Sequence, residues 1–340
     1  MVKVKRLDLR NSKILVTGGA GFIGSEVVHQ LSQMGSNVTI LDNFSSGKPE
    51  YLVRNHNVEV IEGDICDEQL VSAVVKDKEY IIHLAAFPFI PDSYQHPQEF
   101  FNVNTLGTLN LACQSATSGD LKRFVYISTS EVYGTAKYVP MDENHPIRPH
   151  STYAVSKLAA DRAIFTLHKE QGLPAVIIRP FNSFGPNITQ PYIIPEIIFQ
   201  LKNGLKHLQL GNIDSSRDFT YVSDTARGII LALDNKNAIG ETINIGSGMD
   251  ITIKDLGLLI AKLMGKRIEI KIDKSRYRPF DVNRLFSDSQ KAFDLLNWKP
   301  QISINAGLSK TIEWAINSDV AFKDPFKGWV SNTKNTPYRQ

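Results

Sequence analysis

The chain has 340 residues, of which 42% are apolar and 21% charged, so it is long and apolar enough to bury a large core in about two structural units. The chain has 38 Lys and Arg and 35 Asp and Glu, which leaves a formal net charge of +3 with no long block of one sign. This balance argues against nonspecific electrostatic binding to nucleic acid. The sequence has no run of about 18 apolar residues and no apolar stretch near its N-terminus, so we expect neither a membrane protein nor a secreted one.

From Lys13 onward, short β-branched runs alternate with amphipathic stretches. The pattern predicts strands at 14–16, 38–41, 58–61, 80–84, 124–128 and 175–179, and helices at 24–34, 68–75, 100–116 and 153–171. This alternation is typical of an α/β fold of the Rossmann type, a doubly wound parallel sheet with helices on both faces. We therefore expect a dinucleotide-binding domain over residues 1–180.

The alternation loosens beyond Pro180, where isolated helices are predicted at 194–202 and 253–264. A strand followed by a helix at 218–232 is expected to return to the main sheet, within a returning segment of about 218–245. The rest of 181–325 is predicted to form a smaller, discontinuous substrate-binding lobe, and the polar residues 326–340 a surface tail.

A glycine-rich turn follows the first predicted strand directly and runs into a helix. Its spacing is G-x-x-G-x-x-G, with Gly18, Gly21 and Gly24 as the glycines and Phe22 and Ile23 between the last two. A dinucleotide pyrophosphate needs close backbone N–H groups and the positive end of a helix dipole, which this order supplies. The turn therefore predicts a dinucleotide site.

Asp42 ends the second predicted strand and is followed by Asn43. A carboxylate there accepts hydrogen bonds from two ribose hydroxyls and repels a 2′-phosphate, so NAD is favoured over NADP. Further cofactor contacts are expected after the third and fourth strands, at Asp64, Ile65, Leu84, Ala85 and Ala86.

A phenol and an ammonium stand four residues apart, so Tyr153 and Lys157 share one face of the helix predicted at 153–171. A phenol, with an ordinary pKa of about 10, becomes a useful base near neutral pH only where positive charge stabilises the phenolate. Lys157 and an oxidised nicotinamide would both do so. Upstream, at the end of a predicted strand, STSEVYG offers the hydroxyl of Thr129 and the carboxylate of Glu131.

The linked motifs TGGAGFIGS, HLAA, NVNTLGTLNL, STSEVYG, YAVSK, RPFNSFGP and RDFTYVSD occur in one order over about residues 12–315. In this they resemble the extended short-chain dehydrogenase/reductase family, specifically its nucleotide-sugar epimerases, dehydratases and decarboxylases. The resemblance implies NAD as cofactor, a catalytic triad of Thr129, Tyr153 and Lys157, and a cofactor contact at Asn104. It also implies that a nucleotide sugar is bound by Thr129, Asn182, Arg217, Asn244 and Arg278, with the two arginines clamping the diphosphate.

The reaction depends on Glu131, a position that is usually small or neutral in the epimerases of this family. A carboxylate there is what the 4,6-dehydratases use to remove the C5 proton while water leaves from C6. Their glucose-nucleotide members carry Thr-Asp-Glu, whereas this chain has Thr129-Ser130-Glu131, as in dehydratases of GDP-mannose and UDP-N-acetylglucosamine. The expected activity is a lyase, a 4,6-dehydratase acting on a UDP-N-acetylhexosamine. A UDP-sugar 4-epimerase and a UDP-glucuronate decarboxylase, which shares Ser-Glu and needs an arginine such as Arg217, stay open.

Members of this family pair two helices per subunit in a four-helix dimer interface. Apolar side chains permit a homodimer here, although they could equally face the subunit's own core: Leu106, Leu109, Leu158 and Ala159.

Cys66 and Cys113 are too few for a disulfide framework and lack C-x-x-C spacing. We therefore expect two buried, reduced thiols, no metal site and a cytoplasmic protein.

Overall fold

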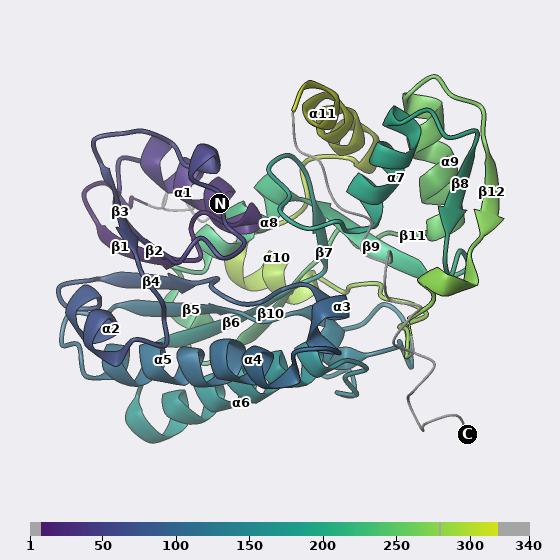
Figure 1. The fold of residues 1–340 in the computed structure, drawn as a ribbon. Helices are drawn as coiled ribbons and strands as arrows, with labels where there is room; N and C mark the ends of the chain where they lie inside the picture. Colours follow the sequence, from purple (N-terminus) through teal and green to yellow (C-terminus); the bar gives the residue numbers. More distant parts are fainter. Residues whose placement is uncertain (1–7, 279, 319–340) are drawn as a thin grey trace, which may run out of the picture.

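The computed structural model describes residues 8–278 and 280–318, and within them a parallel sheet of seven strands forms the centre of the molecule (Figure 1). The strand order is β10-β6-β5-β4-β1-β2-β3, and every neighbouring pair is parallel. The strands are β1 (Lys13–Thr17), β2 (Asn37–Asp42), β3 (Val58–Glu62), β4 (Tyr80–His83), β5 (Arg123–Ile127), β6 (Ala175–Pro180) and β10 (Thr242–Ile245). The predicted α/β class with a Rossmann-type sheet is confirmed.

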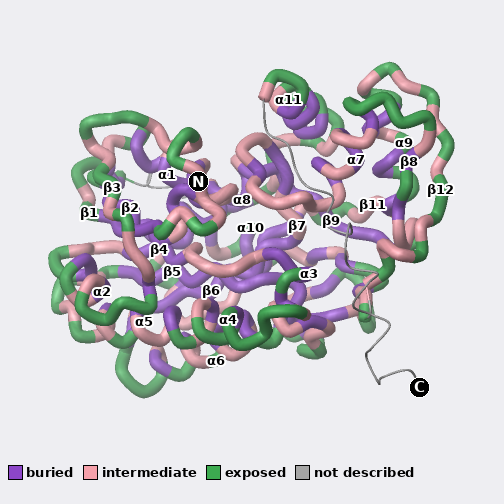
Figure 2. Tube along the Cα trace, in the orientation of Figure 1, coloured by how far each residue is buried: buried purple, intermediate pink, exposed green. Residues whose placement is uncertain are grey.

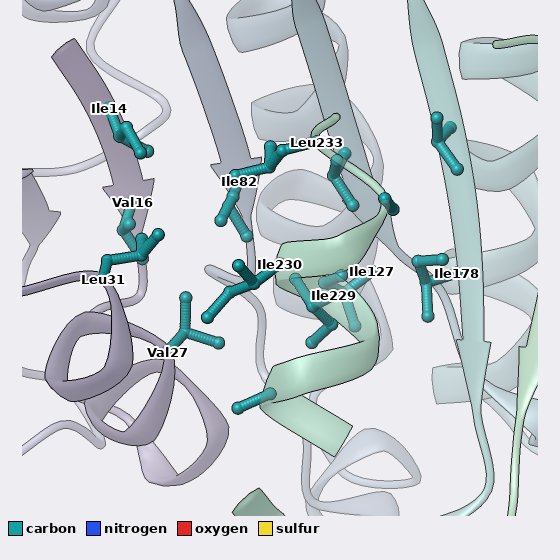
Figure 3. Packing of buried hydrophobic residues seen from close by; sticks show 14 of the residues in the cluster. Ile14, Val16, Val27, Leu31, Ile82, Ile127, Ile178, Ile229, Ile230 and Leu233 are labelled. Carbon is teal, nitrogen blue, oxygen red and sulfur yellow. The ribbon is translucent and has the colours of Figure 1, made fainter. Parts of the chain in front are cut away.

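Side chains on the central strands alternate between two hydrophobic clusters, one on each face of the sheet. In β1, Ile14 and Val16 enter one cluster and Leu15 enters the other, as the two-residue period of a strand requires. Figure 3 shows the first cluster, where Ile229 and Ile230 of a helix meet the isoleucines and valines of the sheet. Both faces of the central strands are therefore buried, which is why β1 and β2 are runs of Val, Ile and Leu, whereas the edge strand β3 alternates.

Helices cover both faces of the sheet (Figure 1). One face packs against α1 (Phe22–Gln33), α8 (Val222–Leu231) and α10 (Gln290–Leu296), and the other against α2 (Glu68–Val74), α5 (Thr108–Ala116) and α6 (Thr152–Gln171). The predicted helix at 100–116 is divided into α4 (Pro97–Phe101), the π-helical turn η2 (Asn102–Gly107) and α5. Shorter elements are α3 (Ile90–Ser93), η1 (Pro49–Tyr51), η3 (Ser130–Tyr133) and η4 (Lys236–Ala238).

Helix α6 has well-formed ends that fix where its functional residues lie. Ser151 is the N-cap of the helix, and its hydroxyl accepts a hydrogen bond from the Ala154 N–H at 3.1 Å. The helix therefore begins at Thr152, and Tyr153 lies in its first turn. At the other end Gly172 takes a left-handed conformation with φ of 73° and closes the helix. The inward face, with Ala160, Ile164 and Leu167, packs on the sheet.

The smaller lobe is built on separate sheets. A three-stranded sheet joins β7 (Asn182–Phe184), β9 (Ser216–Tyr221) and β11 (Asp250–Thr252), and a two-stranded one joins β8 (His207–Leu210) and β12 (Glu269–Ile272). Helices α7 (Ile193–Lys202), α9 (Ile253–Leu263) and α11 (Ile304–Asn317) pack with them around one apolar cluster, and the short η5 (Lys274–Arg276) follows β12. Figure 2 shows this lobe with its own buried interior.

The strand of the predicted unit 218–232 does not return to the main sheet, so that expectation is wrong. This strand is β9, which pairs with β7 and β11, and the strand that joins the main sheet is β10, parallel to β6. The helix that follows β9, α8, does pack against the main sheet and α1. A local pattern shows that a segment is a strand, but its partner is decided by the chain on either side.

The two cysteines are exposed instead of buried. Cys66 follows the loop after β3, and Cys113 lies on α5 beside the buried Leu111 and Ala112 but points away from them. No helix in the described part of the chain is long and apolar enough to cross a bilayer. The tail predicted at 326–340 lies outside the described residues, and the boundaries of the two predicted domains stay a prediction.

Candidate active site

A cavity of about 360 Å³ lies where the order of the central strands reverses, between β1 and β4, and extends to the smaller lobe. Ligands of open parallel sheets bind at this switch point, beyond the carboxyl ends of the strands. The cavity is lined by all the predicted site residues except Asn104 and Asn244: Gly18, Gly21, Phe22, Ile23, Gly24, Asp42, Asn43, Asp64, Ile65, Leu84, Ala85, Ala86, Thr129, Glu131, Tyr153, Lys157, Asn182, Arg217 and Arg278.

The glycine-rich turn forms one wall of this cavity, and its glycines are required by close backbone approach. A Cβ on Gly18, whose φ is 70°, would lie 2.6 Å from the Ala85 nitrogen, and a Cβ on Gly24 would lie 2.1 Å from the Gly18 oxygen. Helix α1 begins after Gly21 with no side-chain cap, which leaves its first N–H groups available to a phosphate. The cradle fits a dinucleotide pyrophosphate.

Asp42 is held by the backbone at the end of β2. One carboxylate oxygen accepts the Ala20 N–H and the other accepts the Phe44 N–H, both at 2.9 Å. Its side chain lines the cavity, where the remaining lone pairs can accept ribose hydroxyls. A 2′-phosphate would be repelled by the negative charge of Asp42, so the hydrogen-bond acceptors at this position fit NAD and not NADP.

Asn43 and Asp64 form a second polar contact at this end of the cavity. The Asn43 side-chain amide donates to Asp64 Oδ2 at 2.9 Å, and the Cys66 N–H donates to Asp64 Oδ1 at 2.8 Å. Burial raises the pKa of Asp64, but the hydrogen bonds from Cys66 and Asn43 outweigh it and leave the pKa below its ordinary value. Asp64 therefore stays ionised as an acceptor.

Tyr153 and Lys157 lie one turn apart on α6, and both line the cavity. Burial raises the pKa of Tyr153 above its ordinary value, opposed by a hydrogen bond with Thr129 and increased by the charge of Glu131. Burial lowers the pKa of Lys157 to about 7, against the opposing charge of Asp161. In the protein alone the phenol is protonated, so a positive charge placed beside it is needed to make it a base.

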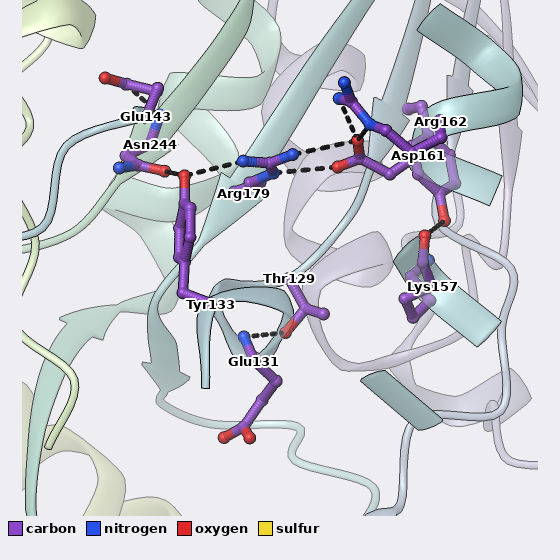
Figure 4. Close-up of polar contacts among 10 residues, drawn as sticks. Thr129, Glu131, Tyr133, Glu143, Lys157, Asp161, Arg162, Arg179 and Asn244 are labelled. Carbon is purple, nitrogen blue, oxygen red and sulfur yellow. Dashed lines mark hydrogen bonds and ion pairs between the residues drawn. The ribbon is translucent and has the colours of Figure 1, made fainter. Parts of the chain in front are cut away.

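Glu131 enters the cavity from η3, the 3₁₀ turn that follows β5. The turn is started by Thr129, whose side-chain oxygen accepts the Glu131 N–H at 3.2 Å (Figure 4). Only 9% of Glu131 is exposed, and its charge acts on both Tyr153 and Arg217. The carboxylate, the phenol and a guanidinium therefore surround one region of the cavity.

Arg217 and Arg278 meet at Asp281, which also lines the cavity. An Arg217 Nη atom lies 3.4 Å and an Arg278 Nη atom 3.8 Å from the same Asp281 Oδ1. Burial lowers the pKa of Arg217, while Glu131 and Asp281 oppose this shift. Two guanidiniums beside one shared carboxylate offer paired N–H donors, which suit a diphosphate.

Two polar atoms of the cavity lining are buried with no hydrogen-bond partner among the described residues: Ser128 Oγ and Asn182 Oδ1. Buried polar atoms without partners are costly, so their place in the wall points to a polar ligand that completes them. Asn182 was predicted from the sequence as a substrate contact, and Ser128 was not. An Asn side chain can present either its oxygen or its nitrogen, because a flip exchanges them.

The structure does not bring Asn104 or Asn244 to the cavity. Asn104 lies in η2 and is fully buried; its side chain accepts the Phe87 N–H at 2.8 Å and donates to the Phe87 oxygen at 3.1 Å and to Ser156 Oγ at 3.0 Å. Asn244 is also fully buried, with its side chain bonded to Tyr133 and Met141. Contacts of these two side chains with ligand stay predictions, and in this structure Asn104 holds the loop at Phe87 beside the cavity.

Aromatic side chains form another part of the wall. The rings of Phe89 and Tyr192 meet edge to face with centroids 6.0 Å apart, and both residues line the cavity. Tyr192 lies near Tyr153 and Arg278, since the charges of both groups affect its pKa, which burial raises. A Tyr before α7 gives no signal in the sequence because nothing local relates it to Tyr153.

A Rossmann sheet, a glycine turn at its switch point and a Tyr–Lys pair beside a Thr that follows β5 together define an extended short-chain dehydrogenase/reductase. The family model described as GDP-mannose 4,6 dehydratase matches residues 15–311, and the chain belongs to this family of nucleotide-sugar enzymes.

Similar proteins carry out more than one reaction on nucleotide sugars. A dTDP-glucose 4,6-dehydratase of Streptomyces niveus is 33% identical over 93% of this chain and 96% of its own length. A UDP-glucuronic acid decarboxylase 1 of Xenopus tropicalis is 32% identical over 92% of this chain and 74% of its own.

Solved structures show the same range. The UDP-N-acetylglucosamine 4-epimerase from Methanobrevibacter ruminantium, in complex with UDP-N-acetylmuramic acid, has a TM-score of 0.84 and 32% identity, covering 90% of this chain and 99% of that one. A dTDP-glucose 4,6-dehydratase from Streptomyces venezuelae, solved with NAD bound, has a TM-score of 0.82 and 30% identity, covering 89% of this chain and 96% of that one. Similarity alone therefore leaves the reaction open.

Proposed function

We propose that this protein is an NAD-dependent nucleotide-sugar 4,6-dehydratase, a lyase. The observation that carries the proposal is the buried carboxylate of Glu131, which lines the cavity beside Thr129 and acts on the Tyr153 phenol. A 4-epimerase needs no acid or base beyond the Tyr, whereas removal of water across C5 and C6 needs a group to take one proton and give another.

The residues have separable roles in this reaction. Tyr153 takes the proton of the sugar O4 hydroxyl, Thr129 holds that oxygen, and Lys157 stabilises the phenolate with its positive charge. NAD⁺, when bound, supplies the acceptor for the C4 hydride and later its donor. Glu131 removes the C5 proton, which is acidic because C4 is a ketone, and the resulting carboxylic acid protonates the C6 hydroxyl as it leaves as water. The hydride then returns to C6, and a proton from solvent adds to C5.

The substrate proposed is a UDP-N-acetylhexosamine. Arg217 and Arg278 bind the diphosphate, with Asn182 completing its contacts, because these three residues line the cavity and the two guanidiniums lie beside the same Asp281 carboxylate. The Thr129-Ser130-Glu131 order, without the Asp of the glucose-nucleotide enzymes, supports an acetamido sugar or mannose over glucose.

A substrate panel tests this proposal. Purified protein is incubated with UDP-N-acetylglucosamine, GDP-mannose and dTDP-glucose, and the products are weighed by mass spectrometry. The expected result is loss of one water, with UDP-N-acetylglucosamine consumed fastest. Mass-neutral conversion would identify a 4-epimerase, and no water loss from any substrate would refute the dehydratase.

The second candidate is a UDP-glucuronate decarboxylase, favoured by one feature of the site. Arg217 is buried close enough to Glu131 for the carboxylate to affect its pKa, so a substrate carboxylate at C5 could pair with this guanidinium. Release of carbon dioxide from UDP-glucuronate, with no water lost from the other sugars, would establish this reaction instead.

We propose a homodimer built on the outer surface of α4, η2 and α6, and a cytoplasmic location where the exposed thiols of Cys66 and Cys113 stay reduced. Leu106 is 57% exposed and Val155 40%, which supports an apolar contact surface. Of the other residues expected there, Leu109 and Leu158 pack partly against the subunit's own clusters, and Ala159 is half-buried. A monomeric mass in light scattering at micromolar concentration would refute the dimer.

A further inference from the structure

A buried polar network joins the two elements that carry the catalytic residues. Arg179, on β6, donates from Nε to Asp161 Oδ2 at 2.9 Å and from a terminal nitrogen to Asp161 Oδ1 at 3.1 Å. Its other terminal nitrogen donates to the Tyr133 hydroxyl at 3.0 Å. Asp161 lies on α6 one turn after Lys157, and Tyr133 lies on η3 two residues after Glu131 (Figure 4). One guanidinium thus spans the helix and the turn.

The three residues at the centre of the network are buried. Arg179 is 2% exposed and Asp161 and Tyr133 are fully buried, and the Tyr133 hydroxyl donates onward to Asn244 Oδ1 at 2.8 Å. The Arg179 guanidinium also lies over the Tyr133 ring, 4.9 Å from its centroid. A buried ion pair with every polar group satisfied holds its elements in one arrangement, because any shift would leave a charge without a partner.

Lys157 receives its negative neighbour from this network. On its own helix, Asp161 opposes the effect of burial on Lys157, and Arg162 contacts Asp161 from the exposed side. From β5, the Tyr126 ring lies 4.5 Å from the Lys157 ammonium.

Besides Tyr153, one turn away on α6, Lys157 has another titrating neighbour in His83, on β4. Burial, and then the charge of Lys157, lower the pKa of His83 to about 3, so it is neutral near pH 7. Among these groups Asp161 is the carboxylate that favours the charged form of Lys157.

We propose that Arg179, Asp161 and Tyr133 are positioning residues that tie the helix carrying Tyr153 and Lys157 to the turn carrying Glu131, and that the Asp161 carboxylate keeps Lys157 charged. The inference rests on the proposed function for the roles of Tyr153, Lys157 and Glu131. Without this network the two halves of the site would each persist, but the spacing of base and phenol and the charge beside the phenol would change.

Two variants separate the two parts of the proposal. The double variant Asp161→Asn/Arg179→Met removes both charges of the buried pair, so neither Asp161 nor Arg179 is left as an unpaired charge, and Lys157 alone loses its carboxylate. Tyr133→Phe removes only the hydroxyl that links Arg179 to η3. The matched controls are Glu170→Gln, which removes an exposed carboxylate from the same helix, and Tyr138→Phe, which removes an exposed phenol hydroxyl.

The first readout needs no substrate. The protein is prepared with isotope-labelled lysines, and the Lys157 side chain is titrated with pH by NMR. The Lys157 signal is identified as the one that is missing from the spectrum of Lys157→Met. We expect a wild-type midpoint near the pKa of about 7, and a midpoint lower by about one pH unit or more in the double variant. Glu170→Gln should leave the midpoint unchanged. An unchanged midpoint in the folded double variant would overturn the role of Asp161.

The second readout is kinetic and uses whichever substrate the panel identifies. Tyr133→Phe is expected to lower kcat by about ten-fold or more with KM within about two-fold, because a small displacement of the base affects the transition state more than binding. Tyr138→Phe should retain wild-type kcat. Wild-type kcat in Tyr133→Phe would overturn the positioning role. If no substrate is turned over, the dehydratase proposal fails, but the Lys157 titration still decides the role of Asp161.

Discussion

The side-chain oxygen of Thr129 accepts the backbone N–H of Glu131 at 3.2 Å. Thr129 therefore does two things: it hydrogen-bonds with the phenol of Tyr153, and it starts the turn that aims Glu131 into the cavity. The oxidation half of the proposed reaction and its elimination half are joined at this one side chain.

Thr129→Ala should damage both halves. Loss of the cap and of the contact with Tyr153 is expected to lower kcat by about 10²-fold and the free energy of unfolding by about 1 kcal/mol. Thr129→Ser keeps the hydroxyl and should recover most of both. Steady-state kinetics and urea unfolding measure the two effects, and equal losses in the Ala and Ser variants would contradict the role of the hydroxyl.

Tyr153 is expected to ionise in response to the cofactor. Burial and the Glu131 charge raise its pKa in the protein alone, and the positive charge of an oxidised nicotinamide should lower it. The measurement is the phenolate absorbance of wild type minus that of Tyr153→Phe, titrated with pH with and without NAD⁺. The difference should appear at lower pH when NAD⁺ is present; identical curves would argue against the phenol as base.

Asp42→Asn should weaken NAD binding and reduce the preference over NADP. Charge-assisted hydrogen bonds to ribose are worth about 1.5–3 kcal/mol, so a loss of about 10- to 100-fold in NAD affinity is expected. Calorimetry with both cofactors measures it, and Asp120→Asn, at an exposed position, is the control. Unchanged NAD affinity would show that Asp42 does not hold the ribose.

Arg217→Lys should weaken the binding of UDP, because an ammonium cannot reproduce the two-pronged contact of a guanidinium. We expect about a ten-fold higher Kd, measured by calorimetry in the absence of sugar. Arg284→Lys is the matched control, since Arg284 pairs with Asp250 at 2.7 Å outside the cavity lining. Equal effects of the two substitutions would contradict a specific role for Arg217.

His83 should make the protein sensitive to acid. Its ring nitrogens bond with Thr17 at 2.7 Å and Thr108 at 2.8 Å, and burial lowers its pKa to about 3 from 6.5. Because the folded pKa lies below the unfolded one, the neutral ring contributes stability that is complete above pH 6.5 and is lost as the pH falls toward 3.

Between pH 7 and 5 this loss is on the order of 1–2 kcal/mol of unfolding free energy. Urea unfolding at both pH values measures it, and His83→Gln should reduce the pH dependence by that amount. A variant with the same pH dependence as wild type would show that His83 is not the group responsible.

The sequence predicts best what is local. The turn from Gly18 to Gly24 and the Tyr153–Lys157 pair depend on spacing within one turn or helix, and the structure places them at the cavity. Asn104 and Asn244 show the opposite case, because their amides are used by Phe87, Tyr133 and Met141, partners that only the folded chain brings near.

Strand pairings and ion pairs between residues far apart in the chain could not be predicted from the sequence either. Nothing in Ser216–Tyr221 distinguishes a strand of the main sheet from one paired with β7 and β11. Likewise Asp281 shares its carboxylate with Arg217 across more than sixty residues, so its place between two arginines follows from tertiary structure alone.

The most direct test of the account follows the C5 proton. Wild-type protein and Glu131→Gln are given the substrate in D₂O, and the products are analysed by mass spectrometry and NMR. We expect wild type to release water and incorporate one deuterium at C5, while Glu131→Gln loses this activity by about 10²-fold or more but still forms NADH absorbance from bound NAD⁺. A product of unchanged mass with no deuterium at C5, made equally well by Glu131→Gln, would contradict it.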